Sequence, residues 1–169
     1  MTRFTMIVVF ALLPLLTTQA VAQRKSLTES GRAPAAASLS ITGKVGGKSL
    51  EASGSGSCRH APDASIRGVS ASLWMVQYGG GEGGVKQLNL TLWRPKDGSP
   101  DQLSLGFETK SGEHRIETGQ GEHKGEGAVT ILPNGPGGRL ELSGKEAGGK
   151  PVQIMIDCPA FAGVEAEGG

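Results

Sequence analysis

The sequence predicts an all-β fold, an antiparallel β-sandwich or closed barrel of about eight or nine short strands with one disulfide. Apolar residues recur at every second position in segment after segment, which is the period of a half-buried strand. The chain of 169 residues has 28 glycines and few aromatic residues, a composition typical of many turns. Convincing patterns with the period of a helix are absent. This length suits one domain and is too short to suggest two.

The clearest alternation lies in residues 85–93, where Leu88, Leu90 and Leu92 fall on one face and polar residues stand between them. The glycine-rich segment 79–84 is predicted as a loop between two strands. Further strands are predicted over residues 39–45, 50–58, 69–78, 103–107, 115–118, 127–132, 139–143 and 152–158. Several are separated by pairs that supply the positive φ angles of tight hairpins: Gly46-Gly47, Asp97-Gly98, Ser111-Gly112 and Asn134-Gly135.

The chain has two cysteines, and the alternation puts both on the inward face of their strands. Cys158 shares the apolar face of residues 152–158, and Cys58 shares a face with Leu50, provided that no bulge interrupts residues 50–58. In an exported protein two cysteines are expected to pair, because the destination is oxidising. We predict a disulfide between Cys58 and Cys158, which makes the early and final strands neighbours. The alternative is that the two cysteines bind a metal or act as catalytic thiols, but they lack the C-x-x-C spacing that such pairs usually have.

The first 22 residues have the organisation of an export signal. Arg3 precedes an apolar run over residues 6–16, and the small-residue site Ala20-Val21-Ala22 follows. The run is shorter than the roughly 20 residues that a membrane-spanning helix needs. We therefore predict cleavage after Ala22, an exported protein in the periplasm or outside the cell, and no membrane span.

The rest of the chain divides into three parts by composition. Residues 23–37 contain one leucine and no aromatic residue, which predicts a disordered tether after the signal peptide at 1–22. Residues 38–162 carry the predicted strands and form the β domain. The small and acidic end, residues 163–169, is predicted as a flexible tail.

The charge balance bears on the choice of partner. The chain has 17 Lys and Arg against 16 Asp and Glu, and removal of the signal peptide takes away Arg3, which leaves equal numbers. A protein that holds a phosphate backbone usually has a basic excess on one face. We therefore expect no nucleic-acid partner, and the expected partner is an unknown protein or a ligand of the cell envelope.

A short local repeat carries the most suggestive polar residues. The pair Glu113-His114 recurs nine residues later as Glu122-His123. On adjoining strands of a hairpin these pairs would bring imidazoles and carboxylates together, as in zinc or copper sites, with His60 as a third nitrogen. The alternative is a solvated hairpin in which acids and bases pair across strands. A metal site at His114, His123 and His60 is thus one hypothesis, and no cofactor is assigned.

Three aromatic side chains are candidates for a binding platform. Trp93 falls on the polar side of its strand, whereas Trp74 and Tyr78 lie on a strand that is apolar on both sides. Rings on a sheet face can stack on sugars or on partner side chains. The alternative is that these rings pack in the core or cap strand ends. Carbohydrate binding through Trp93, Trp74 and Tyr78 is a further hypothesis.

The spacings that mark catalytic residues are not found. The serine-hydrolase motif G-x-S-x-G needs a sharp strand-to-helix turn, which the alternating glycine and serine of residues 53–57 do not fit. Glycosidase chemistry needs two well-placed carboxylates, and no spacing singles out a pair among the 16 acids. We therefore expect that the protein is not an enzyme.

Three motifs give the domain its outline. An opening strand with Ile-Thr-Gly at 41–43 is followed by a Gly/Ser-rich strand that reaches Cys58, and residues 152–158 close the domain. This outline resembles the small exported lipoprotein antigens of mycobacteria, although the chain lacks the lipid-anchoring cysteine. The resemblance implies an envelope or surface interaction domain without catalysis over residues 38–160. The leading hypothesis is therefore an exported, non-enzymatic β-sandwich that acts as an interaction or envelope-associated module.

Overall fold

The structure is a computed structural model that describes residues 36–66, 68–119 and 124–164. The predicted signal peptide, residues 23–35 of the predicted tether and residues 165–169 of the predicted tail lie outside the described residues. The described part of the chain consists of strands and their connections, without a helix. It starts its first strand at Ala37, one residue before the predicted start of the β domain.

Each of the nine predicted strands is present, and a two-residue strand follows them. The predicted hairpin glycines have positive φ angles, for example 56° at Gly46 and 59° at Gly135, a conformation that glycine adopts without strain. The strands are β1 (Ala37–Val45), β2 (Lys48–Ile66), β3 (Val69–Gly83), β4 (Val85–Pro95), β5 (Gln102–Thr109), β6 (Gly112–Glu117), β7 (Glu126–Asn134), β8 (Gly137–Lys145), β9 (Pro151–Cys158) and β10 (Ala162–Gly163).

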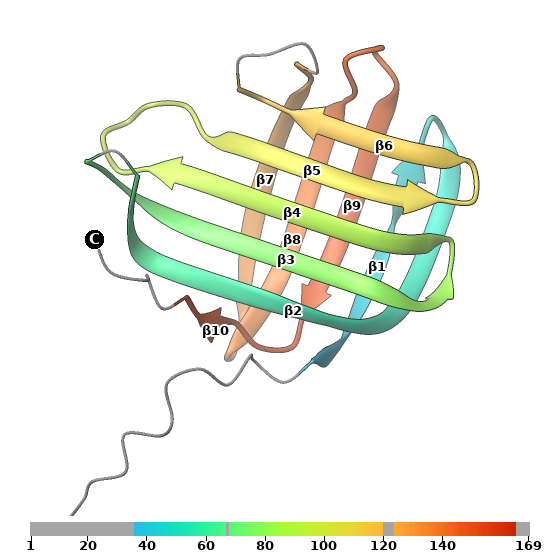
Figure 1. Cartoon of the computed structure of the whole chain (residues 1–169), viewed down its shortest axis with the longest axis horizontal. Coiled ribbons are helices and arrows are strands. Elements are labelled where there is room, and N and C mark those ends of the chain that lie inside the picture. Colours follow the sequence, from blue (N-terminus) through green and yellow to red (C-terminus); the bar gives the residue numbers. More distant parts are fainter. Residues whose placement is uncertain (1–35, 67, 120–123, 165–169) are drawn as a thin grey trace, which may run out of the picture. The chain divides into compact units, whose positions relative to one another are not determined.

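Strands β1 to β9 form one antiparallel sheet in the order β6-β5-β4-β3-β2-β1-β9-β8-β7. The sheet curls into a half-barrel, and in Figure 1 strands β2 to β6 cross in front of β1, β9, β8 and β7. Between the two terminal strands β6 and β7, a bridge pairs Glu117 with Lys124, and Gly125 N donates to Glu117 O at 2.7 Å. The all-β antiparallel class is confirmed, while the sandwich or closed barrel stays a prediction.

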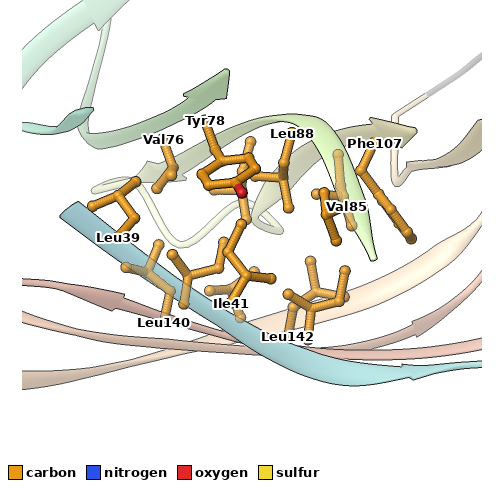
Figure 2. Packing of buried hydrophobic residues seen from close by; sticks show 14 of the residues in the cluster. Leu39, Ile41, Val76, Tyr78, Val85, Leu88, Phe107, Leu140 and Leu142 are labelled. Carbon is orange, nitrogen blue, oxygen red and sulfur yellow. The ribbon is translucent and has the colours of Figure 1, made fainter. Parts of the chain in front are cut away.

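The concave side of the sheet holds the hydrophobic core. On β9 every second residue from Val152 to Cys158 is buried, as the two-residue period requires. Figure 2 shows Leu39 of β1 and Leu140 of β8 on one side of this core, and Tyr78 of β3 on the other. Full burial of a leucine or isoleucine side chain contributes about 1.5–3 kcal/mol. Apolar side chains therefore fill the interior and hold the two halves of the curled sheet together.

The glycine-rich segment 79–84 is not the loop that the sequence predicted. β3 continues to Gly83, and Gly81 lies opposite Gly54 of β2. A Cβ atom on Gly81 would collide with the carbonyl oxygen of Ser53. Glycine here permits a close approach of two paired backbones rather than a flexible connection, so glycine density alone was a misleading signal.

Cys58 and Cys158 form the predicted disulfide, with their Cα atoms 6.0 Å apart. The register between β2 and β3 shifts between Gly54 and Gly56, but the extra residue lies on β3, since Gly54 pairs with Gly81 and Gly56 with Tyr78. β2 itself pairs with β1 without a break as far as Gly56, so the alternation that the prediction assumed holds, and Cys58 is buried. β1 lies between β2 and β9 in the sheet, and its first residue pairs with Gly56. The disulfide therefore joins β2 directly to β9 just beyond the start of β1.

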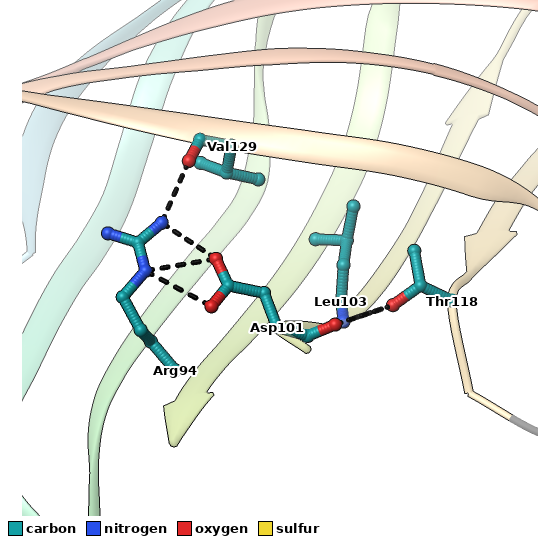
Figure 3. A network of polar contacts seen from close by, with 5 residues as sticks. All are labelled: Arg94, Asp101, Leu103, Thr118 and Val129. Atoms are coloured by element: carbon teal, nitrogen blue, oxygen red, sulfur yellow. Dashed lines mark hydrogen bonds and ion pairs between the residues drawn. The ribbon is translucent and has the colours of Figure 1, made fainter. Parts of the chain in front are cut away.

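A polar bridge also joins the two halves of the sheet. Arg94, near the end of β4, donates from Nη2 to the Asp101 carboxylate at 2.8 Å and to the Val129 carbonyl oxygen of β7 at 3.0 Å (Figure 3). Its Nε donates to the same carboxylate at 2.9 Å. β4 and β7 are not neighbours in the sheet. We call Arg94, Asp101 and Val129 the Arg94 bridge, because they connect β4 to β7, two strands that are not paired by backbone hydrogen bonds.

Candidate functional site

His114, the central residue of the predicted metal site, lies on β6 and faces the core. It is 6% exposed, whereas Glu113 and Arg115 on either side are exposed. Its ring stacks on Phe107 of β5, the residue opposite in the register, with centroids 4.8 Å apart and planes 28° apart. Because neighbouring residues of a strand point to opposite faces, Glu113 cannot act on the same side of the sheet as His114.

Both ring nitrogens of His114 have hydrogen-bond partners. Nδ1 lies 2.8 Å from Glu146 Oε1, and Nε2 lies 3.3 Å from Thr109 Oγ1. An ionised carboxylate only accepts hydrogen bonds, which assigns Nδ1 as the donor to Glu146; in the neutral tautomer with its proton on Nδ1, Nε2 is an acceptor. Thr109 Oγ1 in turn lies 2.8 Å from Ser111 Oγ. We call Thr109, Ser111, His114 and Glu146 the His114 cluster.

Glu146 reaches His114 from the connection between β8 and β9. The turn is held by its own backbone, since Glu146 N donates to Lys150 O at 3.0 Å and Gly149 N donates to Glu146 O at 2.8 Å. Lys150 Nζ lies 3.5 Å from Glu146 Oε2. Sequence reasoning missed Glu146, because it lies 32 residues from His114 and no local pattern links the two positions. The curl of the sheet brings them together, because β6 and β9 are separated by five strands in the sheet order.

The structure does not bring His60 to His114. His60 lies on β2, with three strands between it and β6, and the register offsets the two residues by four positions along the strands. That offset alone is about 13 Å, whereas zinc needs its ligands within about 2.3 Å. His123 lies outside the described residues. Within the described ranges, no group of three or more His, Cys, Asp or Glu residues could hold a metal ion.

His60 instead belongs to a stack of planar side chains. Its ring lies parallel to Trp74, with centroids 4.5 Å and planes 9° apart, and Phe161 approaches edge-on at 6.1 Å. The Arg94 guanidinium lies 5.4 Å from the Trp74 ring. His60 Nε2 is buried and has no hydrogen-bond partner among the described residues. Burial lowers the pKa of His60, because the imidazolium would lose hydration.

The three predicted aromatic binding residues are buried. Trp74 and Tyr78 belong to the core cluster, and Tyr78 is only 2% exposed. Burial of its hydroxyl raises the pKa of Tyr78. Trp93 is 6% exposed although it lies outside that cluster, where it pairs with Leu73 of β3. Their burial favours a packing role, because a sugar-stacking ring must present a face to solvent.

Shallow hollows lie on the outer face of the sheet, and two of them differ in their surroundings. The first, about 580 Å³, crosses β7, β8, β9, β1 and β2, and we call it the β1–β9 hollow. The second, about 610 Å³, crosses β4, β5 and β6 over Gly106, and we call it the β4–β6 hollow. A Cβ atom on Gly106 would meet nothing within 4 Å, so the floor of this second hollow is open. These outer hollows are the surfaces at which a ligand could bind without opening the core.

No protein-family model, curated protein or solved structure matches the chain. The resemblance to mycobacterial lipoprotein antigens therefore stays a prediction. None of the described segments is a helix with the length and apolar character needed to cross a membrane.

Proposed function

We propose that this chain is an exported interaction module that binds a partner protein of the cell envelope through the β1–β9 hollow. The observation that carries the proposal is an exposed methionine at the centre of a rigid sheet face. Met155 of β9 is 40% exposed on the outer face of the sheet, while its neighbours along the strand, Ile154 and Ile156, point to the other face and are fully buried. Exposed methionine is adaptable in shape and is common at protein-binding surfaces.

The surroundings of Met155 suit a protein partner. One register row crosses five strands on this face, from Thr130 through Glu141, Met155 and Thr42 to Glu51. The row thus offers an apolar centre with hydroxyls and carboxylates around it, as in a binding patch with a polar rim. A sheet face fixed by a packed core and a disulfide is ordered before binding, which lowers the entropic cost of association.

The charges of this face are available to a partner. The ion pairs found among the described residues use none of Lys44, Glu51 and Glu141, which line the β1–β9 hollow. In the β4–β6 hollow, by contrast, Glu108 pairs with Lys86 and Arg115 pairs with Glu117. Unpaired charges on a surface give specificity and faster association with an oppositely charged partner. This difference favours the β1–β9 hollow as the binding face.

Site-specific crosslinking in the exporting cell tests the proposal. A photoreactive side chain at Met155 should yield a discrete crosslinked species, and the same group at Asn89 in the β4–β6 hollow should not. Reversal of charge in a Lys44→Glu, Glu141→Lys double variant should weaken that crosslink, because it inverts the pattern that the partner meets. Equal crosslinking from both positions, or none from Met155, would contradict the proposal.

A further inference from the structure

The His114 cluster contains an ordered set of hydrogen bonds that ends at an exposed hydroxyl. Ser111 lies at the tip of the β5–β6 hairpin and is exposed, whereas Thr109 and His114 are buried. From the surface inward, Ser111 Oγ lies 2.8 Å from Thr109 Oγ1, which lies 3.3 Å from His114 Nε2. His114 Nδ1 then lies 2.8 Å from Glu146 Oε1. A solvent-facing hydroxyl is thus connected to a carboxylate through a hydroxyl and an imidazole.

The donors and acceptors along this series of hydrogen bonds agree in direction. Glu146 can only accept from Nδ1, which leaves Nε2 to accept from Thr109. Thr109 Oγ1 has two lone pairs, one for the Ser111 backbone N–H at 3.1 Å and one for the Ser111 hydroxyl. Its own proton has two acceptors at nearly equal distance, His114 Nε2 at 3.3 Å and Gly112 O at 3.2 Å. A proton can therefore pass from Ser111 to His114 without rearrangement of the backbone.

We propose that the His114 cluster is an acyl-transfer site at which Ser111 is the nucleophile and small carboxylic esters are the substrate class. In unrelated folds a serine is activated by a base that a third group orients, and here the hydroxyl of Thr109 links Ser111 to such a base. His114 is the general base, Thr109 relays the proton, and Glu146 positions the ring. Phe107, stacked on the imidazole, shields one of its faces from water. This site is independent of the β1–β9 hollow.

The reaction is a simple exchange of one ester for another. Ser111 Oγ forms a bond to the carbonyl carbon of the ester, its proton passes to Thr109 Oγ1, and the Thr109 proton passes to His114 Nε2. The bond between the carbonyl carbon and the leaving oxygen then breaks, and the leaving group takes the electron pair and a proton that returns from the imidazolium through Thr109 Oγ1. The products are acyl-Ser111 and an alcohol, and no further reactant is needed.

Acetylation by p-nitrophenyl acetate, followed at residue level by mass spectrometry, tests this proposal on the intact exported protein. Ser143, an exposed serine of β8, serves as an internal reference in the same molecule. Because general-base catalysis contributes about 10²–10⁴-fold, Ser111 should react at least about 100-fold faster than Ser143. Hydroxylamine, which cleaves esters but not amides, distinguishes acetyl-Ser111 from acetyl-Lys110. Equal rates at Ser111 and Ser143 in the unmodified chain would overturn the proposal.

Variants separate the relay from a general effect of the fold. His114→Gln and Thr109→Val should each bring the Ser111 rate down to that of Ser143, and Glu146→Gln should lower it less. Glu113→Gln is the matched control, because Glu113 adjoins His114 on β6 but is exposed on the opposite face, and it should leave the rate unchanged. Since the readout is a ratio of two serines in one chain, a partly unfolded variant raises both rates rather than the ratio. A Ser111 preference that persists in Thr109→Val and His114→Gln would overturn the relay.

Discussion

The two described histidines place the same ring in opposite surroundings. His60 is stacked on Trp74 and meets Phe161 edge-on, and its buried Nε2 has no hydrogen-bond partner among the described residues. His114 is stacked on one ring, and both of its nitrogens have polar partners. His60 is therefore a packing group, while His114 is held by polar contacts at both of its nitrogens. The surroundings of an imidazole, more than its presence in the sequence, decide its chemistry.

The two regions also differ in how they join the halves of the sheet. Near His60 the connections are a covalent bond, Cys58–Cys158, and the permanently charged Arg94 bridge. Near His114 the side-chain connection from β6 to the β8–β9 turn is the hydrogen bond of His114 to Glu146. The His60 region is thus joined by a covalent bond and a guanidinium with three hydrogen bonds, and the His114 region by a single contact between an imidazole and a carboxylate.

Removal of the disulfide from the His60 region should have the largest effect on the free energy of unfolding. The bond closes a loop with a sequence separation of 100. In the double variant Cys58→Ser, Cys158→Ser the unfolded chain is no longer constrained. The free energy of unfolding should therefore fall by about 2–5 kcal/mol. Denaturant titration measures the change. A loss below about 1 kcal/mol would mean that Arg94 and the core alone fix this region.

Replacement of His114 by leucine should have the next largest effect. The Glu146 carboxylate, whose side chain is 15% exposed, would lose the imidazole hydrogen bond and keep only Lys150, and the Thr109 hydroxyl would lose one of its two acceptors. A hydrogen bond to a charged group contributes about 1.5–3 kcal/mol, so the free energy of unfolding should fall by about that amount. Arg115→Leu on the same strand is the control, because its exposed pair with Glu117 contributes at most about 1 kcal/mol. Equal losses in the two variants would contradict a structural role for His114.

Arg94→Met should cost less than the His114 substitution. The Arg94–Asp101 pair is partly exposed, and such pairs contribute about 0–1 kcal/mol. The hydrogen bond to the Val129 carbonyl oxygen adds a comparable amount and is the part that reaches β7. Amide hydrogen exchange in β7 should therefore increase more than global stability falls. Arg94→Lys should not rescue it, because an ammonium cannot make the two-pronged contact with Asp101.

The fold was largely predictable from the sequence, and the His114 cluster was not. Alternation is local, so it located all nine long strands and the inward direction of Cys58. The partner of His114 is set by the curl of the sheet, which brings the β8–β9 turn back to β6 and leaves no trace in nearby residues. The glycines of 79–84 were misinterpreted for the same reason, since their close approach to β2 is a property of pairing and not of the segment itself.

The smallest expected effect is the part of the pH dependence of stability that comes from His60. Burial lowers the pKa of His60 below its ordinary value of 6.5, so the unfolded chain takes up a proton that the folded chain does not. The stability that His60 contributes is complete above pH 6.5 and is lost as the pH falls through its lower folded pKa. Asp63 and Asp97, whose pKa values are lowered from 3.8, act only at more acidic pH.

His60→Phe should remove this dependence while keeping the stack on Trp74. Between pH 7.5 and pH 5.5 the midpoint of denaturant unfolding should therefore fall less in the variant than in the natural chain. His114 and His123 are present in both proteins, so the difference between the two curves reports His60 alone. Identical curves would mean that the His60 ring accepts its proton as readily in the folded protein as in the unfolded one. The stack on Trp74 would then leave the His60 ring more hydrated than its burial implies.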